Sequence, residues 1–277
     1  MARRQTPEDR AAWLAEVSKV NVDRPNAARM YDYFLDGNTN LAVDRAAAEE
    51  LLTTGPWRTY ARANRAFLGR AVRFVAQQGI DQFLDLGSGI PTVGNVHEIA
   101  HRSNPAARVA YVDIEPVAVA HARRLLADFD NVSITQADIR EPAEVLAQPG
   151  IAELLDLTRP VAVLAVAILP FITDDDDVAE LVAGYRSVCV PGSYLAISHT
   201  SQLSLTEDQQ ARGVELMKRT PTPAVYRTEE QIRPLLAGYE LVEPGLVWTP
   251  HWRPDDNPAW LPEPAEANAF AAVGRLP

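Results

Sequence analysis

The most informative local pattern in the chain is the stretch Phe83-Leu84-Asp85-Leu86-Gly87-Ser88-Gly89-Ile90. It consists of an apolar run that ends in a carboxylate and leads into two glycines separated by one residue. Glycine permits a tight turn and lets backbone N–H groups approach a ligand closely, and a doubly wound sheet binds its ligands at the carboxyl ends of its strands. The stretch therefore indicates a cofactor-binding turn, although by itself it also fits an ordinary strand-to-helix connection.

The residues that follow alternate between short apolar runs and longer amphipathic segments. This alternation is typical of βαβ units around a parallel sheet. The expected parallel strands are residues 82–86, 108–112, 132–135, 161–166 and 194–198. Short strand-like pieces near the end of the chain, expected to add antiparallel strands, are residues 239–242, 246–248 and 270–275. We therefore predict an α/β fold with a doubly wound, mostly parallel seven-stranded sheet of the Rossmann-like type.

The chain is expected to have two parts. Residues 1–79 have a helical, polar-faced character and predict an N-terminal helical cap, whereas residues 80–277 predict the α/β domain. A polar stretch at about residues 201–236 is broken at residues 220–223, where threonine and proline alternate. We expect this stretch to form an insertion over the ligand cleft.

The composition and charge of the chain exclude several classes of protein. A chain of 277 residues with 47% hydrophobic content can bury a substantial core. The single cysteine excludes an internal disulfide and the charged first residues lack an apolar export region, which predicts a cytoplasmic protein. The longest apolar stretch, residues 161–172, is shorter than the roughly 20 residues of a membrane span. The net charge of −11 argues against a nucleic-acid partner, because phosphate recognition needs a basic face.

Two more of the expected strands end in aspartate. Asp113 follows the second strand and can accept hydrogen bonds from ribose hydroxyls, although it could instead cap the helix that begins at Pro116. Asp138 follows the third strand and can accept from an adenine amino group. Ile114 and Ile139 can then enclose the purine between apolar faces. Three consecutive strands that each end in aspartate are more specific than any one of them.

The order of these elements resembles the class I S-adenosylmethionine-dependent methyltransferases from residue 83 to about residue 201, including a Pro-Gly turn at residues 191–192. More narrowly, residues 25–45, 89–92 and 95–98 resemble a bacterial S-adenosyl methyltransferase family whose substrates are largely unassigned. The resemblance implies bound S-adenosylmethionine, with Asp85 orienting the glycine turn and the methionyl amine. The implied cofactor contacts are Asp85, Gly87, Ser88, Gly89, Asp113, Ile114, Asp138, Ile139, Val166 and Ala167.

One departure from the class pattern bears on the cofactor. Pro91 stands where the class favours a third glycine, which affects the geometry of the turn. The competing interpretation, a nicotinamide-binding fingerprint, requires glycine at position 92. This chain has Thr92 there, so the close helix-to-strand contact that glycine permits would be lost. S-adenosylmethionine is therefore favoured over a nicotinamide.

The N-terminal segment of the same family offers further contacts. The resemblance implies that Arg29, Tyr31 and Asn40 close over the methionine end of the cofactor, with Arg29 pairing with its carboxylate. The alternative is that they belong to a polar helix face and turn, because arginine and tyrosine are common on surfaces.

Catalytic residues are harder to find, because methyl transfer needs a positioned acceptor and only sometimes a general base. His199, after the fifth strand, is the first candidate for a base, followed by Tyr31, His97 and His251. Each has a structural alternative. The four aspartates at 174–177 precede an apolar-periodic helix and are expected to cap it rather than bind a metal, and no spaced ligand cluster suggests a metal site.

Two functions remain open at this point. The first is a methyltransferase that acts on a small-molecule acceptor, and the second is a non-catalytic S-adenosylmethionine-binding sensor or scaffold. The fold alone does not separate them. Five tryptophans fit a cap that encloses an apolar or aromatic acceptor, or ordinary packing. An open acceptor pocket beside the cofactor would favour the enzyme.

Overall fold

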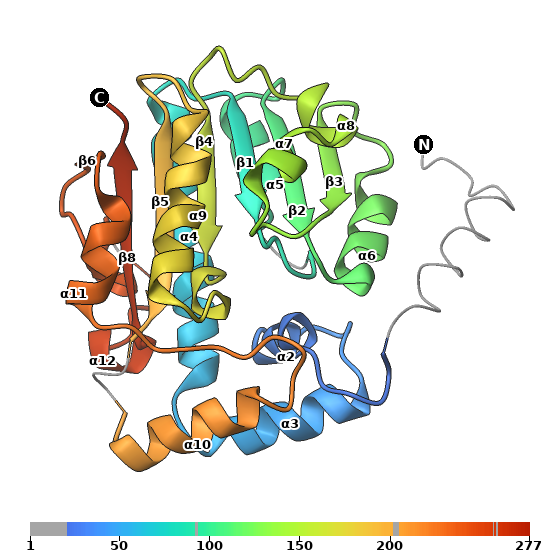
Figure 1. Cartoon of the computed structure of the whole chain (residues 1–277), viewed down its shortest axis with the longest axis vertical. Helices are drawn as coiled ribbons and strands as arrows, with labels where there is room; N and C mark the ends of the chain where they lie inside the picture. Colours follow the sequence, from blue (N-terminus) through green and yellow to red (C-terminus); the bar gives the residue numbers. More distant parts are fainter. Residues whose placement is uncertain (1–20, 92–93, 202–204, 257, 259) are drawn as a thin grey trace, which may run out of the picture.

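A computed structural model describes residues 21–91, 94–201, 205–256, 258 and 260–277. Within them, eight strands form one sheet with the order β3-β2-β1-β4-β5-β8-β6, and β7 also pairs with β8 (Figure 1). The five parallel strands are β1 (Gln82–Leu86), β2 (Arg108–Asp113), β3 (Val132–Gln136), β4 (Ala162–Val166) and β5 (Tyr194–Thr200). The parts of the expected cap and insertion at residues 1–20 and 202–204, and Thr92, lie outside the described residues.

All three strand-like pieces expected near the end of the chain form antiparallel strands, so the sheet has eight strands and not the predicted seven. β8 (Ala269–Arg275) pairs along the whole of β5. Its other edge is shared by two short strands, because β6 (Glu240–Leu241) pairs with the end of β8 and β7 (Val247–Trp248) pairs with its beginning. Two short strands occupying one position explain why the sheet has eight strands and not seven.

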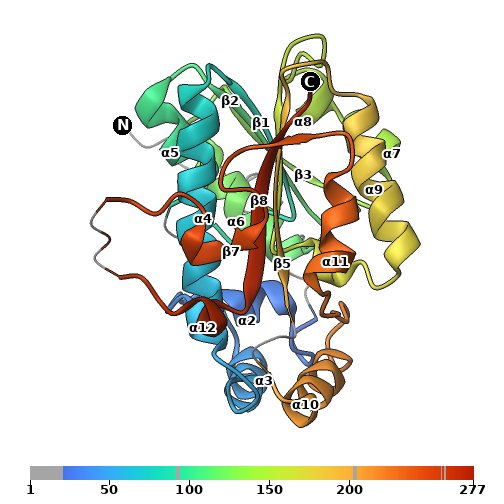
Figure 2. The ribbon, with the colours of Figure 1, turned by 90° about the vertical axis from the view of Figure 1, so that its left-hand side faces the viewer.

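Helices cover both faces of the sheet (Figure 2). One face is packed by α4 (Trp57–Gln77), α5 (Val96–Ser103) and α6 (Pro116–Leu126), together with η3 (Thr249–His251) and α12 (Pro264–Ala267) near α4. The other is packed by α7 (Pro142–Leu146), α8 (Pro149–Ala152), α9 (Asp175–Ser187), α11 (Glu229–Ile232) and η2 (Arg233–Leu236).

The apolar strands are buried from both sides because successive residues point to opposite faces. Phe83 packs in the α4 layer and the adjacent Leu84 in the α9 layer, and both are almost completely buried. This is why the strand at the glycine turn reads as a continuous apolar run rather than an alternating one. The turn that follows it is thereby fixed at the carboxyl edge of the sheet.

The N-terminal helical cap lies below this edge in Figure 1, beside the insertion. It contains α2 (Ala27–Phe34) and α3 (Ala42–Leu52), and α10 (Glu207–Met217) of the insertion packs next to α3. The helix α4 was expected to belong wholly to the cap. Instead its first turns contribute Trp57 and Tyr60 to the core of the cap, while Phe67 and Val72 pack on the sheet, because a helix of 21 residues is about 30 Å long and spans both parts.

The aspartates that precede α9 have the expected role. Asp174 is the helix N-cap and its carboxylate accepts from the backbone N–H groups of Asp176 and Asp177. Three further acidic residues occupy the first turn, where the helix dipole favours negative charge. In the part of the chain that the structure describes, no group of three or more histidine, cysteine or acidic side chains is arranged to hold a metal, and no helix has the length and apolarity needed to cross a membrane.

Candidate active site

A cavity of about 530 Å³ lies between the carboxyl edge of the sheet, the cap and the insertion. Its size falls in the range of small-molecule sites. Of the site residues expected from the sequence, those that line it are Tyr31, Asp85, Gly87, Ser88, Gly89, Asp113, Ile114, Asp138, Ile139, Val166 and Ala167. Arg29 and His199, both within the described residues, lie outside this lining. The carboxyl ends of neighbouring parallel strands share one edge, which is why the three aspartates meet here.

The two glycines of the turn serve different purposes. Both have left-handed backbones, with φ of +70° at Gly87 and +66° at Gly89. The Gly87 N–H donates to the Val112 carbonyl at 2.8 Å, and a Cβ atom there would lie 2.4 Å from the side chain of Ile168. A Cβ atom at Gly89 would meet no described atom within 4 Å, so this glycine leaves space on the cavity side of the turn. Gly87 is needed for packing and Gly89 leaves room for a ligand.

The Asp113 carboxylate joins the glycine turn to the loop after β2. One oxygen accepts from the Gly89 N–H at 2.7 Å and the other from the Glu115 N–H at 2.8 Å. A carboxylate has about four acceptor positions, so both oxygens can still accept from ribose hydroxyls. Burial raises the pKa of Asp113, while these backbone N–H groups oppose the rise.

Asp85 stands at the methionyl end of the expected cofactor site. Burial raises the pKa of its carboxyl to about 7; the positive charge of Arg65 opposes this rise and the negative charge of Asp113 adds to it. Arg65 comes from α4 and also lines the cavity. Arg65 was not predicted as a site residue, because α4 carries several arginines and no local sequence pattern distinguishes this one from the others.

The adenine end combines apolar and charged groups. Ile114 is half exposed, which is unusual for isoleucine, while Ile139 is buried. The Asp138 carboxylate accepts from Nε of Arg140 at 2.9 and 3.0 Å, and this hydrogen bonding lowers the pKa of Asp138. Asp138 is therefore charged at neutral pH and remains an acceptor for an amino group.

The end of β4 is held in an unusual conformation beside the cavity. Ala167 has φ of +60°, which costs a residue with a Cβ atom about 1–2 kcal/mol. Its N–H donates to Oγ of Ser198 at 2.9 Å, and Ser198 in turn donates to the Asn64 side chain on α4. Strained backbones of this kind persist where the surroundings fix them and are common at functional sites.

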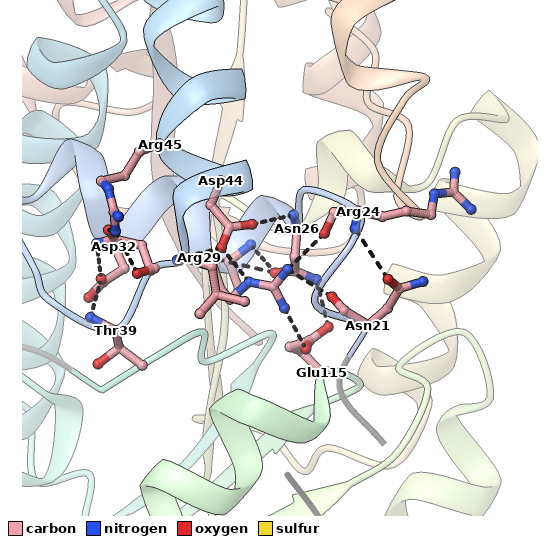
Figure 3. A network of polar contacts seen from close by, with 12 residues as sticks. Asn21, Arg24, Asn26, Arg29, Asp32, Thr39, Asp44, Arg45 and Glu115 are labelled. Carbon is pink, nitrogen blue, oxygen red and sulfur yellow. Dashed lines mark hydrogen bonds and ion pairs between the residues drawn. The ribbon is translucent and has the colours of Figure 1, made fainter. Parts of the chain in front are cut away.

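Arg29 was expected to pair with the cofactor carboxylate, and the structure places it elsewhere. Its guanidinium is buried in the cap, where Nε donates to Asp44 at 2.6 Å and Nη2 to the Arg24 carbonyl at 2.8 Å (Figure 3). The reason is that Asp44 is itself completely buried and needs a partner of opposite charge. Asn40 also remains in the cap, where it donates to Asp32 at 2.8 Å.

His199 was expected to face the acceptor as a base, and its surroundings do not permit this. The ring is 1% exposed, with Nδ1 2.8 Å from the Thr200 carbonyl and Nε2 2.9 Å from Nη1 of Arg227. Because arginine can only donate, Nε2 accepts and Nδ1 carries the proton. Burial lowers the pKa of His199 to about 3. His97 and His251 also lie outside the cavity lining, and Nδ1 of His97 is bound to the Tyr111 hydroxyl at 2.8 Å.

The far end of the cavity is lined by aromatic and apolar side chains. Trp57 meets Tyr60 edge-on at 5.6 Å between ring centroids and stacks with Tyr226 at 6.1 Å. Tyr31 donates its hydroxyl to the Ala61 carbonyl at 3.1 Å, and burial raises its pKa to about 12. The insertion closes this end with Gly213, Val214, Met217, Pro221, Thr222, Pro223, Ala224, Val225 and Tyr226.

Residues 14–277 match the model of the S-adenosyl methyltransferase family. The chain belongs to this family. Its cofactor is therefore S-adenosylmethionine, and the glycine turn, the open space at Gly89 and the acceptor positions of Asp113 fit that molecule.

Two solved structures show the same fold over nearly the whole length of this S-adenosyl methyltransferase. A protein of Thermobifida fusca YX, provisionally described as a methyltransferase, shares 40% identity with a TM-score of 0.85, covering 91% of this chain and 95% of its own. A DUF574 family protein of Streptomyces avermitilis MA-4680 shares 34% identity with a TM-score of 0.87, covering 92% and 99%. Among curated proteins, no sequence match is found.

Proposed function

We propose that this S-adenosyl methyltransferase transfers the methyl group of S-adenosylmethionine to a neutral, predominantly apolar small molecule. One observation carries the proposal: a single cavity reaches from the glycine turn to the aromatic wall of the cap and insertion. A protein that only sensed the cofactor would not need a second, apolar compartment continuous with the cofactor site.

At the cofactor end, we assign a contact with S-adenosylmethionine to each of five lining residues. Asp113 accepts from the ribose hydroxyls, and Ile114 and Ile139 enclose the purine. Asp85 pairs with the methionyl ammonium. Arg65 pairs with the methionyl carboxylate, which is the contact that the sequence had predicted for Arg29. When bound, S-adenosylmethionine supplies an electrophilic methyl group attached to a sulfonium.

At the acceptor end, charge and shape limit the substrate. Apart from Asp32, and from Arg65 which we assign to the cofactor carboxylate, the described residues that line the cap and insertion side carry no ionised group, and the aromatic rings offer flat apolar faces. An anionic acceptor would find no cationic partner there, whereas a neutral ring can stack. The net charge of −11 also disfavours a nucleic acid.

The proposed mechanism relies on positioning. Tyr31 has a pKa of about 12 and donates its one O–H to the Ala61 carbonyl. At neutral pH its oxygen can therefore accept a hydrogen bond from an acceptor hydroxyl but does not remove the proton. The strained end of β4 and the rings of the cap would hold the acceptor oxygen facing the methyl group. As the bond from that oxygen to the methyl carbon forms, the bond from sulfur to the methyl carbon breaks, S-adenosylhomocysteine leaves, and the proton of the acceptor hydroxyl passes to solvent water. Such alignment accounts for a large share of the rate in reactions between two bound molecules.

Calorimetric titration with S-adenosylmethionine, S-adenosylhomocysteine and NAD tests the cofactor assignment. We expect the two sulfur ligands to bind and NAD not to bind, and Asp113→Ala to weaken binding strongly. Asp36→Ala is the matched control, because Asp36 lies on the exposed side of the cap and pairs with Arg58 and Arg62. Binding of NAD alone would refute the assignment.

A methyl-transfer screen tests the acceptor class. Neutral phenols and aromatic alcohols are compared with aromatic carboxylates, peptides and oligonucleotides, with labelled methyl groups counted in the product. We expect methylation among the neutral aromatic compounds. Methylation of peptides or oligonucleotides alone would contradict the proposed acceptor, and cofactor binding without any methylation would favour the sensor function.

A further inference from the structure

Glu115 reaches from the cofactor loop to the N-terminal helical cap (Figure 3). Nδ2 of Asn26 donates to one of its carboxylate oxygens at 2.6 Å, and Nη1 of Arg29 lies 3.7 Å from the other. Glu115 and Asn26 both line the cavity, one from the sheet side and one from the cap side. Their contact therefore bridges the cavity at its nucleotide end.

On the sheet side, Glu115 is tied to the residues proposed to bind the cofactor. Its N–H donates to one oxygen of Asp113, and the other oxygen of Asp113 accepts from Gly89. The glycine turn, the ribose-binding carboxylate and the contact with the cap are thus consecutive members of one chain of hydrogen bonds. A ligand that fixes Asp113 also fixes Glu115, because only Ile114 separates them.

On the cap side, the contact is attached to a rigid base. Oδ1 of Asn26 accepts from the N–H groups of Ala28 and Arg29, so Asn26 is the N-cap of α2. Its backbone N–H donates to Asp44 at 2.9 Å, and Asp44 is the buried partner of Arg29. Because Asp44 belongs to the first turn of α3, the starts of both cap helices move with Asn26.

We propose that Glu115 is a positioning residue that seats the cap on the cofactor loop, so that cap docking and cofactor binding stabilise each other. The inference rests on the proposed cofactor site. The cap contributes the aromatic wall of the acceptor end, so the same contact places Tyr31 and its neighbours for the acceptor. Coupling of this kind is reciprocal: a bound cofactor stabilises the docked cap, and a cap that docks less tightly lowers the affinity for the cofactor.

The test replaces the contact without removing the helix N-cap. Asn26→Asp keeps an oxygen for the α2 N–H groups, because aspartate caps helices as well as asparagine does, but it places a second carboxylate against Glu115. Glu115→Gln keeps an acceptor for Asn26 and removes the charge. The double variant with both changes again sets a carboxylate against an amide, with the donor and acceptor exchanged. Asn104→Asp, at the end of α5, adds the same charge away from the cavity.

Two readouts are measured for each variant: the affinity for S-adenosylhomocysteine by calorimetry, and amide hydrogen exchange in α2 and α3 with and without that ligand. For Asn26→Asp we expect affinity to fall about tenfold, which is within the usual range for coupled sites, and ligand protection of α2 and α3 to be lost. Glu115→Gln should have a smaller effect. The double variant should recover most of the affinity and protection, which a purely structural defect would not allow.

Three results would overturn the proposal. The first is an unchanged affinity in Asn26→Asp while the wild type binds normally. The second is a double variant no better than the worse single variant. The third is a wild-type cap whose exchange does not respond to S-adenosylhomocysteine. A wild type that fails to bind the ligand would overturn the cofactor assignment as well, and that failure is recognisable because it precedes any comparison of variants.

Discussion

Nη1 of Arg227 donates to Nε2 of His199 at 2.9 Å, and both side chains are almost completely buried. The same guanidinium bonds to Asp175 at 2.7 Å and to the carbonyl of Ile172 at 2.8 Å. Arg227 therefore ties the insertion to the end of β5, to the loop after β4 and to the start of α9. His199 is the acceptor that completes this junction, which explains why a histidine at the carboxyl edge of the sheet is not available for proton transfer.

Replacing His199 should affect stability more than catalysis. We expect His199→Ala to lower the free energy of unfolding by about 1–3 kcal/mol, because it leaves a buried charged donor without its partner. The turnover number with an acceptor from the screen should change only a few-fold. Urea denaturation and steady-state kinetics measure the two effects, with His251→Ala as a control at an exposed histidine. A loss of turnover of about 100-fold or more with normal stability would instead identify His199 as a base.

The raised pKa of Asp85 predicts opposite pH trends for stability and cofactor binding. The folded protein holds a proton on Asp85 up to about pH 7, whereas the unfolded chain loses it near 3.8. The contribution of Asp85 to stability therefore falls between about pH 4 and pH 7 and is constant above that. The methionyl ammonium favours the charged carboxylate, so affinity for S-adenosylhomocysteine should rise between about pH 6 and pH 8.

Asp85→Asn should remove this pH dependence. We expect the variant to bind S-adenosylhomocysteine more weakly at about pH 8 and with nearly the same affinity at about pH 6. Calorimetry in buffers with different ionisation enthalpies would show the proton released on binding by the wild type and not by the variant. A variant that retains the wild-type pH profile would show that another group titrates.

The two glycines of the turn should respond differently to alanine. Gly87→Ala places a Cβ atom 2.4 Å from Ile168 and should lower the free energy of unfolding by about 2–4 kcal/mol. Gly89→Ala meets no such neighbour and should cost only about 1–2 kcal/mol, from its positive φ. Its Cβ atom enters the cavity instead, so the loss of cofactor affinity should be larger than for Gly87→Ala. Melting temperatures and calorimetry compare them, and the reverse order would contradict the proposed place of the cofactor.

Tyr31→Phe tests whether this tyrosine positions the acceptor or removes its proton. Because burial raises the Tyr31 pKa to about 12, we expect the variant to raise the acceptor KM, to lower the turnover number less than about tenfold, and to leave the pH profile below about pH 9 unchanged. Tyr33→Phe on the same helix is the control, because its hydroxyl bonds to Glu49 and it does not line the cavity. A loss of about 100-fold or more with an altered pH profile would make Tyr31 the base.

Much of the fold could be predicted from local pattern. The bounds of β1 to β4 agree with the expected strands to within one residue, because a short apolar run between amphipathic helices has few other ways to be buried. β5 continues two residues further than expected, to Thr200, because its antiparallel pairing with β8 extends to Ala269. The three strands near the end of the chain were also expected, and only the predicted count of seven was wrong, because β6 and β7 both pair with β8.

Local sequence was enough to predict the strands, the glycine turn and the meeting of Asp85, Asp113 and Asp138, because backbone conformation and strand direction follow from residues close together in the chain. Which long polar side chains reach the cavity depends instead on contacts between residues far apart in the chain. Arg65 lines the cavity, whereas Arg29 pairs with Asp44 and His199 with Arg227. Each of these pairings depends on which buried charge or acceptor the folded chain brings within about 3 Å of the side chain. A buried polar group without such a partner lowers the stability of the fold, whatever its neighbours in sequence.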